Sequence, residues 1–119
     1  MSVFVAIQWS ITEGGEAKID EALASLRAHV DVTHPAIRSV RVFRQFAGPN
    51  PHRAYLWMEE FDSLTAIDQE PDIPECDDVW EPIRALALPG TFYQSVWGDA
   101  GGGGWLSRGL DPSDRASQH

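Results

Sequence analysis

Histidine is the side chain of this sequence best suited to move a proton near neutral pH, because its unperturbed pKa is about 6.5. The chain contains four histidines. His29 lies within a predicted helix and His34 at its end, whereas His52 falls in a predicted turn and His119 in a polar tail. His29 and His34 are therefore the acid–base candidates. A cation near a helix C-terminus is also favoured by the helix dipole, so His34 can equally be a structural residue.

Metal and phosphate motifs are not recognisable in the sequence. No pair of histidines has the spacing of a motif such as H-E-x-x-H, and Cys76 is the only cysteine. The acidic run at 68–81 lacks the spacing and the glycine of a calcium loop, so we interpret it as a solvated surface or a short lid. The glycines at 101–104 open no helix after a strand, unlike a phosphate-binding loop. We expect no metal and no cofactor.

Arg44 is the candidate for stabilising developing negative charge. It lies in a predicted strand and is expected to point toward the helices, beside Leu56 and Met58. A buried Arg needs a partner, which could be a carboxylate or an anionic or enol-type ligand. If it lies near the strand end, its guanidinium can instead reach water. The expected wall of a substrate cleft comprises Trp9, Leu56, Met58 and Trp80, although the tryptophans can equally be core residues.

Four segments have the composition and the alternation of β-strands. They are rich in β-branched and aromatic residues and are bounded by Gly, Pro or Asn. Their predicted ranges are 3–11, 37–47, 53–61 and 91–97.

Two helical segments separate these strands. The first carries apolar residues at helical spacing and ends at His34-Pro35, because proline disfavours helical geometry in the residue before it. Its apolar stripe consists of Ile19, Leu23, Leu26 and Val30. The second begins at a cap formed by Asp62 or Ser63, is interrupted by Pro71 and Pro74, and resumes over 78–88.

The element order is βαββαβ, which predicts an α+β ferredoxin-like fold. Its four antiparallel strands are expected in the order 4-1-3-2, with both helices on one face. Residues 1–97 form this domain. Residues 98–119 are a Gly-rich flexible tail with only Trp105 and Leu106 as large apolar residues, and such a segment cannot form its own core.

The overall charge excludes some classes of partner. The 119 residues include 18 acidic and 9 basic ones, giving a formal net charge of −9. Such a chain lacks the basic footprint that nucleic acids and anionic membranes require.

The sequence has no membrane-length apolar run and no signal-like N-terminus, and a single cysteine forms no internal disulfide. We expect a cytoplasmic protein.

The register of the central hairpin decides which side chains share a face. A turn centred on Asn50 pairs Phe43 with Trp57 and Arg41 with Glu59 across the strands. Both are favourable cross-strand pairs, and a slip of one residue would lose them. The side chains of Phe43, Trp57 and also Tyr55 are then expected to point away from the helices.

An aromatic surface of this kind requires a cover. Two or three exposed rings would forgo several kcal/mol of burial free energy at about 25 cal/mol per Å². A large exposed apolar patch marks an interaction surface. We therefore expect a homodimer formed through the helix-free sheet face, with Trp57 facing the partner subunit.

The helix-backed βαββαβ order resembles the dimeric α+β barrel superfamily. The likeness covers residues 2–97 and includes the broken second helix and the segment DVWEPIRALALPGTFYQSVW, which is similar to the last helix and strand of that family. The superfamily includes antibiotic-biosynthesis monooxygenases, small polyketide cyclases, stress-responsive proteins and haem-binding branches. The resemblance implies a small aromatic ligand in a cleft between sheet and helices. No histidine of this chain is specifically marked as a haem ligand.

The resemblance implies a cofactor-independent monooxygenase or cyclase that acts on an aromatic or polyketide-like substrate. Arg44 would stabilise an oxyanion or enolate, and His29 or His34 would transfer the proton. Two other interpretations are open. The chain could be a non-catalytic ligand-binding or stress-response protein, or a regulatory domain of the amino-acid-sensing type, which shares the element order.

Overall fold

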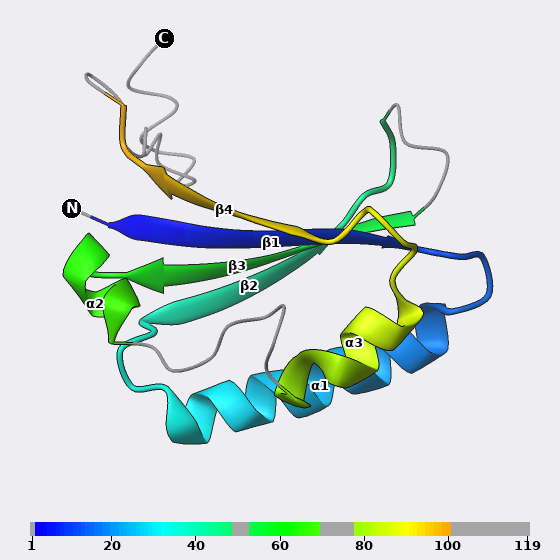
Figure 1. Cartoon of the computed structure of the whole chain (residues 1–119), viewed down its shortest axis with the longest axis horizontal. Helices are drawn as coiled ribbons and strands as arrows, with labels where there is room; N and C mark the ends of the chain where they lie inside the picture. Colours follow the sequence, from blue (N-terminus) through cyan, green and yellow to red (C-terminus); the bar gives the residue numbers. More distant parts are fainter. Residues whose placement is uncertain (1, 49–52, 70–77, 101–119) are drawn as a thin grey trace, which may run out of the picture.

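The computed structural model describes residues 2–48, 53–69 and 78–100 (Figure 1). Its elements are β1 (Val3–Ile11), α1 (Glu16–Thr33), β2 (Ser39–Arg44), β3 (Arg53–Phe61), α2 (Leu64–Asp68), the 3-10 helix η1 (Asp78–Trp80), α3 (Glu81–Leu86) and β4 (Tyr93–Gly98). Several sequence predictions lie outside the described residues. They concern the turn at Asn50, His52, the prolines and acidic loop at 71–77 with Cys76, and the tail from 101 to 119 including Trp105, Leu106 and His119.

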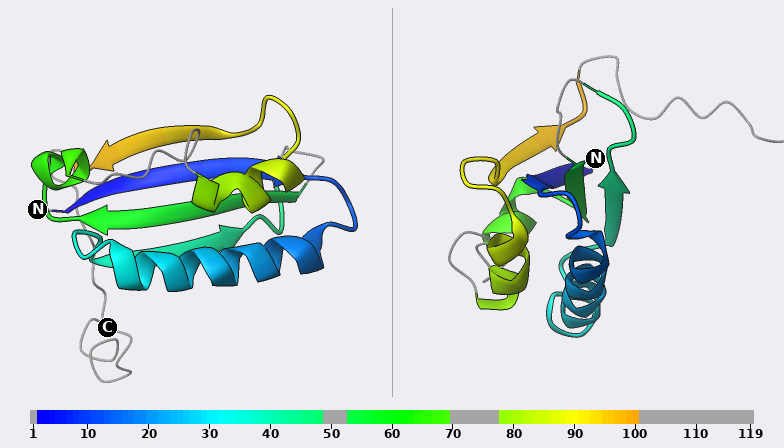
Figure 2. Two further views of the ribbon diagram at one scale, coloured as in Figure 1. Left: turned by 60° about the horizontal axis from the view of Figure 1, so that its bottom comes forward. Right: turned by 90° about the vertical axis from the view of Figure 1, so that its right-hand side faces the viewer.

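One antiparallel sheet with the strand order β2-β3-β1-β4 forms the centre of the molecule. This is the predicted order, counted from the other edge. Figure 2 shows α1 and α3 on the same face of the sheet, while α2 lies beyond the end of β3. The ferredoxin-like architecture is therefore confirmed.

Local chemistry explains where the helices begin and end. The backbone N–H of Gly14, whose φ of 92° suits glycine, donates to the Glu16 carboxylate at the start of α1. The helix ends at Thr33, before His34 and Pro35, as predicted. Its buried residues are the predicted stripe of Ile19, Leu23, Leu26 and Val30. At the start of α2, the Ser63 hydroxyl accepts a hydrogen bond from the Ala66 N–H, which confirms a serine cap.

The β2–β3 register differs by one residue from the sequence prediction. Phe43 lies opposite Leu56 rather than Trp57, and Arg41 lies opposite Met58 rather than Glu59. Because successive side chains of a strand point to opposite faces, this slip turns the whole of β3 over relative to the prediction.

The consequence is that Tyr55 and Trp57 point toward the helices, and Leu56 and Met58 point away from them. Trp57 is 0% exposed, so the prediction that it faces a partner subunit is wrong. The placement of Leu56 and Met58 on the helix side is wrong for the same reason. Burying the aromatic set beneath the helices removes more apolar area from water than burying the aliphatic set would.

A cluster of five aromatic rings fills the core beneath α3: Trp9, Tyr55, Trp57, Trp80 and Phe92. Trp9 stacks on Tyr55 at 5.9 Å between ring centroids. Trp80, delivered by η1, meets both Trp9 and Trp57 edge to face, at 6.2 and 5.4 Å. Such geometries contribute about 0.5–1.5 kcal/mol per pair beyond area burial. The sequence alternative that Trp9 and Trp80 are core residues is therefore the one observed.

The helix-free face of the sheet carries a second set of large apolar side chains, which we call the outer patch. Three of them remain well exposed, namely Phe43 at 43%, Tyr93 at 53% and Trp97 at 61%. The full patch consists of Phe4, Phe43, Leu56, Met58, Tyr93 and Trp97. The prediction of an apolar helix-free face is therefore correct, but two of the rings that it assigned to this face, Tyr55 and Trp57, lie on the other face.

A substitution of Trp57 measures how much this aromatic core contributes to the stability of the fold. Its Nε1–H donates to the buried Glu59 carboxylate at 2.8 Å. We expect Trp57→Phe to lower the free energy of unfolding by about 3 kcal/mol, because it leaves a cavity and removes this donor. Phe46→Tyr, at a ring that is 86% exposed and lies outside the outer patch, is the control and should change stability by less than about 0.5 kcal/mol. Urea denaturation measures both, and equal effects of the two substitutions would contradict the assignment of Trp57 to the core.

The Tyr55 hydroxyl is buried and makes no hydrogen bond with a described residue. Burial of the hydroxyl, and secondly the negative charge of Asp20, raise the pKa of Tyr55 above its usual value of 10.0. The positive charge of the nearby Arg44 guanidinium lowers this pKa and so offsets part of the rise, although the two groups form no hydrogen bond. The folded state therefore holds the Tyr55 proton more tightly than the unfolded state. This contribution to stability is fully present below pH 10 and is lost as the pH rises through the folded-state pKa.

We expect Tyr55→Phe to leave stability at pH 7 unchanged or raised, because the buried hydroxyl loses no hydrogen bond to the described residues. The variant should also lose less stability than the wild type above pH 10. Thermal unfolding across pH 7–11 measures both effects, with Tyr93→Phe on the exposed face as the matched control. A clear loss of stability at pH 7 would show that the hydroxyl has a partner.

Candidate functional site

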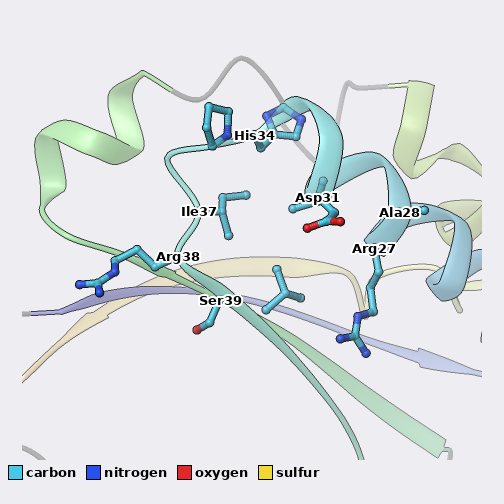
Figure 3. A pocket seen from close by; sticks show the side chains of 10 residues that line it. Arg27, Ala28, Asp31, His34, Ile37, Arg38 and Ser39 are labelled. Atoms are coloured by element: carbon cyan, nitrogen blue, oxygen red, sulfur yellow. The ribbon is translucent and has the colours of Figure 1, made fainter.

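A cleft of about 460 Å³ lies between the C-terminal half of α1 and the beginning of β2 (Figure 3). We call it the α1–β2 cleft. It lies between a helix and the sheet, which is where the sequence prediction expects a ligand. Its lining residues are Arg27, Ala28, Val30, Asp31, His34, Pro35, Ile37, Arg38, Ser39 and Val40.

His34 is the most buried titratable group of this cleft, at 4% exposure. The chain leaves α1 at this residue, because Pro35 follows it, and its backbone N–H still closes the helix by donating to the Val30 carbonyl at 3.0 Å. The imidazole ring lies 5.3 Å from that of His29, at 60° between the ring planes. The structure therefore brings the two predicted acid–base candidates together.

Two arginines mark opposite sides of the cleft. Arg38 forms an ion pair of 2.8 Å with Asp62, in which both side chains are well exposed. Arg27 makes no ion pair or hydrogen bond within the described part of the chain, although Asp31 lies one helical turn further on. Figure 3 shows Arg27 extending from α1 toward the sheet, whereas Arg38 extends away from the other lining residues of the cleft. Arg27 is thus the cation of the cleft that an incoming anion can reach.

Arg44, the predicted oxyanion stabiliser, lies at the other end of β2. It is opposite Tyr55 and so points to the helix side, as predicted, but it is exposed, and its guanidinium lies 5.1 Å from the Phe46 ring centroid. Five strand steps from Ser39 to Arg44 span about 17 Å. Arg44 and the two histidines therefore cannot contact one small molecule together, and the predicted catalytic set is divided.

The predicted substrate wall is divided as well. Trp9 and Trp80 lie in the aromatic core, and Leu56 and Met58 lie on the helix-free face. None of the four lines the α1–β2 cleft. Its apolar lining consists instead of small and aliphatic side chains, namely Ala28, Val30, Pro35, Ile37 and Val40.

Sequence reasoning missed two residues that the structure singles out. Glu59 is a carboxylate at 8% exposure in the core beside the cleft, since it lies opposite the cleft residue Val40. The predicted register placed Glu59 on the outer face against Arg41. A signal was available, because Glu59 alternates with Trp57 and Phe61 on one face of a strand. Arg27 was missed because it lies off the apolar stripe of its helix.

Among residues 2–48, 53–69 and 78–100, no group of three or more His, Cys, Asp or Glu side chains is arranged to hold a metal ion. In the same part of the chain, no helix combines the length and the apolar character needed to cross a membrane.

No protein-family model matches the sequence, and no curated protein matches it. Solved structures do match. A proposed antibiotic-biosynthesis monooxygenase from Deinococcus radiodurans superposes with a TM-score of 0.64 at 12% identity, over 88% of this chain and 99% of that one. SnoaB, a cofactor-independent oxygenase from Streptomyces nogalater, gives 0.63 at 15% identity, over 84% and 94%. A dimeric ferredoxin-like protein of unknown function from Thermobifida fusca gives 0.60 at 7% identity, over 82% and 90%.

These comparisons define the class of fold. The chain has the ferredoxin-like fold of the antibiotic-biosynthesis monooxygenase-like proteins, as the resemblance in the sequence indicated. At these identities the matches show the fold alone, and they transfer no catalytic residue to this chain.

Proposed function

We propose that the protein is a small-molecule enzyme of the cofactor-independent monooxygenase or cyclase type, acting on an aromatic or polyketide-like substrate in the α1–β2 cleft. The observation that carries the proposal is the combination of a buried imidazole, His34, with Arg27, which has no ion-pair partner among the described residues, beside aliphatic side chains of one cleft. A proton acceptor and a cation in one cleft that also carries aliphatic side chains suit a substrate that becomes an enolate.

The two reaction types share their first step. A C–H next to a carbonyl group loses its proton to His34, and the electron pair moves to the carbonyl oxygen, which Arg27 stabilises. The ring centroid of His29 lies 5.3 Å from that of His34, so His29 is close enough to influence the stability of the imidazolium that forms on His34. The half-buried side chains of Ile37 and Val40 shield one side of the enolate from water, which strengthens its attraction to the guanidinium.

The second step depends on the electrophile. In an oxygenation, the enolate carbon reduces dioxygen to a bound hydroperoxide, which takes the proton back and loses water; a CH₂ group and O₂ become a C=O group and H₂O. In a cyclisation, the carbon attacks a second carbonyl of the same substrate, a C–C bond forms, and His34 returns the proton to the new alkoxide. Neither route requires a protein metal. The structural likeness to SnoaB supports the oxygenase class at the level of the fold only.

We further propose that the protein is a homodimer formed through the outer patch. The proposal no longer depends on Trp57, because Phe43, Tyr93 and Trp97 are the exposed rings on the helix-free face. An exposed apolar set of this size marks an interaction surface. The dimeric protein from Thermobifida fusca, which shares the fold, is consistent with a pair of copies.

The alternative function is non-catalytic ligand binding. It is favoured by the aromatic core, because the five packed rings beneath α3 occupy the position where an aromatic substrate would lie between helix and sheet. In that case the α1–β2 cleft binds its ligand and returns it unchanged. Binding without turnover would distinguish this function from the enzyme.

The enzymatic proposal predicts dioxygen consumption with 1,8-dihydroxyanthrone, whose methylene group is acidic. His34→Gln should lower the rate by about 100-fold, as expected for a general base, and Arg27→Gln by a similar factor. Arg53→Gln, which removes a cation on β3 outside the cleft, is the control and should retain the rate. An oxygen electrode gives the rates. A wild-type rate in His34→Gln would exclude this mechanism.

The dimer proposal predicts sedimentation at twice the monomer mass of 13.2 kDa. Trp97→Glu should shift the protein to the monomer, because it buries a charge in the outer patch. Val32→Glu is the matched control, since Val32 is 82% exposed on α1, away from the helix-free face. If both variants or neither dissociate at micromolar concentration, the outer patch is not the interface.

A further inference from the structure

The α1–β2 cleft carries two opposite charges that come from one helix. Arg27 and Asp31 lie about one turn apart on α1, and both line the cleft. Asp31 is the only carboxylate among the described lining residues. Figure 3 shows both side chains on the side of α1 that faces the cleft. A site with charges of both signs favours a ligand whose own charges complement them.

The two side chains do not neutralise each other. Neither makes an ion pair or a hydrogen bond with a residue in the described ranges. Arg27 precedes Asp31 by four residues, and such a helical pair is weaker when the cation comes first, because this order opposes the helix dipole. Figure 3 shows the guanidinium turned toward the sheet, whereas the carboxylate stays beside the helix. Both side chains are exposed, so a ligand reaches them without displacing a protein group.

The surroundings of these charges restrict the shape of the ligand. Arg38 does not compete for the Asp31 carboxylate, because it pairs with Asp62 at 2.8 Å and extends away from the other lining residues. The half-buried side chains of Ile37 and Val40 provide an apolar border on the opposite side of the cleft from α1. Two residues four positions apart on a helix are separated by about 6 Å along its axis. A ligand that meets both charges is therefore about one aromatic ring long.

Asp31 also creates an electrostatic conflict for a purely anionic ligand. An enolate held by Arg27 lies close to the Asp31 carboxylate, and two like charges in one cleft repel each other. A protonated amine on the same ligand removes this conflict, because it pairs with the carboxylate. The charge pattern of the cleft thus favours a ligand with an anionic oxygen and a cationic nitrogen over a ligand with the oxygen alone.

We propose that the α1–β2 cleft binds a flat amphoteric molecule, which presents an anionic oxygen to Arg27 and a protonated amine to Asp31. The inference deepens the proposed function and rests on it where it names the substrate. The aromatic or polyketide-like substrate then carries an amine about 6 Å from the oxygen of its enolate. Binding of an amphoteric probe does not require turnover, so the site can be tested separately from the reaction.

The probe is 4-(aminomethyl)benzoate, titrated into the full chain by calorimetry at low ionic strength. Its carboxylate stands for the enolate oxygen, and its amine lies at the other end of the ring. Two matched ligands each lack one charge: 4-methylbenzoate has no amine, and benzylamine has no carboxylate. We expect the amphoteric probe to bind about fivefold more tightly than either of them, which is the effect of one additional exposed ion pair. Both advantages should shrink as salt is added.

Three variants assign the two advantages to residues. Asp31→Asn should remove the advantage over 4-methylbenzoate, and Arg27→Gln should remove the advantage over benzylamine. Asp20→Asn is the matched control and should preserve both, since Asp20 is an exposed carboxylate of the same helix that does not line the cleft. The control is needed because a chain with a net charge of −9 attracts amines in general.

Two results would overturn the proposal. One is equal affinity of the wild type for the three ligands, or no binding of any of them. The other is a preference for the amine that Asp31→Asn retains, which would assign this preference to the overall charge of the chain. The enzymatic proposal can fail independently. A probe preference without dioxygen consumption supports the amphoteric site and non-catalytic binding, whereas turnover of 1,8-dihydroxyanthrone without a probe preference supports the enzyme and overturns the amphoteric site.

Discussion

The contact between Trp80 and Trp57 fixes the arrangement of the rest of the molecule. A strand has two faces, and β3 carries large apolar side chains on both of them. Trp80, which η1 inserts beneath the sheet, meets Trp57 at 5.4 Å and so selects the aromatic face of β3 for the core. Once that choice is made, the alternation of the strand sends Leu56 and Met58 outward. The outer patch and the buried position of Glu59 both follow from it.

The architecture could be predicted from the sequence because its signals are local. The β1 strand shows its alternation within nine residues, and α1 shows a stripe at helical spacing. The pairing register of β2 and β3 could not be predicted in this way. Both candidate registers give sensible neighbours, and the contact that decides between them comes from Trp80, more than twenty residues further along the chain.

The candidate site, like the fold, could be predicted from the sequence only where the signal is local. His29 and His34 lie together because they are about one and a half turns apart at the end of one helix. Arg44 was grouped with them through its face alone, although the length of β2 holds it at the opposite end of the sheet. Glu59 was missed because the predicted register of β2 and β3 placed it on the helix-free face. Arg27 lies on the polar side of α1, and only the position of β2 relative to that helix shows that its charge reaches a cleft.

The two edges of the sheet differ in a way that affects how copies of the chain can meet. At one edge, β2 and the residue before it present the guanidinium groups of Arg38, Arg41 and Arg44, and like charges discourage another strand from pairing there. At the other edge, β4 is short but carries the exposed side chains of Val96 and Trp97. A sheet with one charged border cannot be extended by regular addition of further copies from edge to edge. The chain is thereby biased toward closed, face-to-face association and away from fibrous growth.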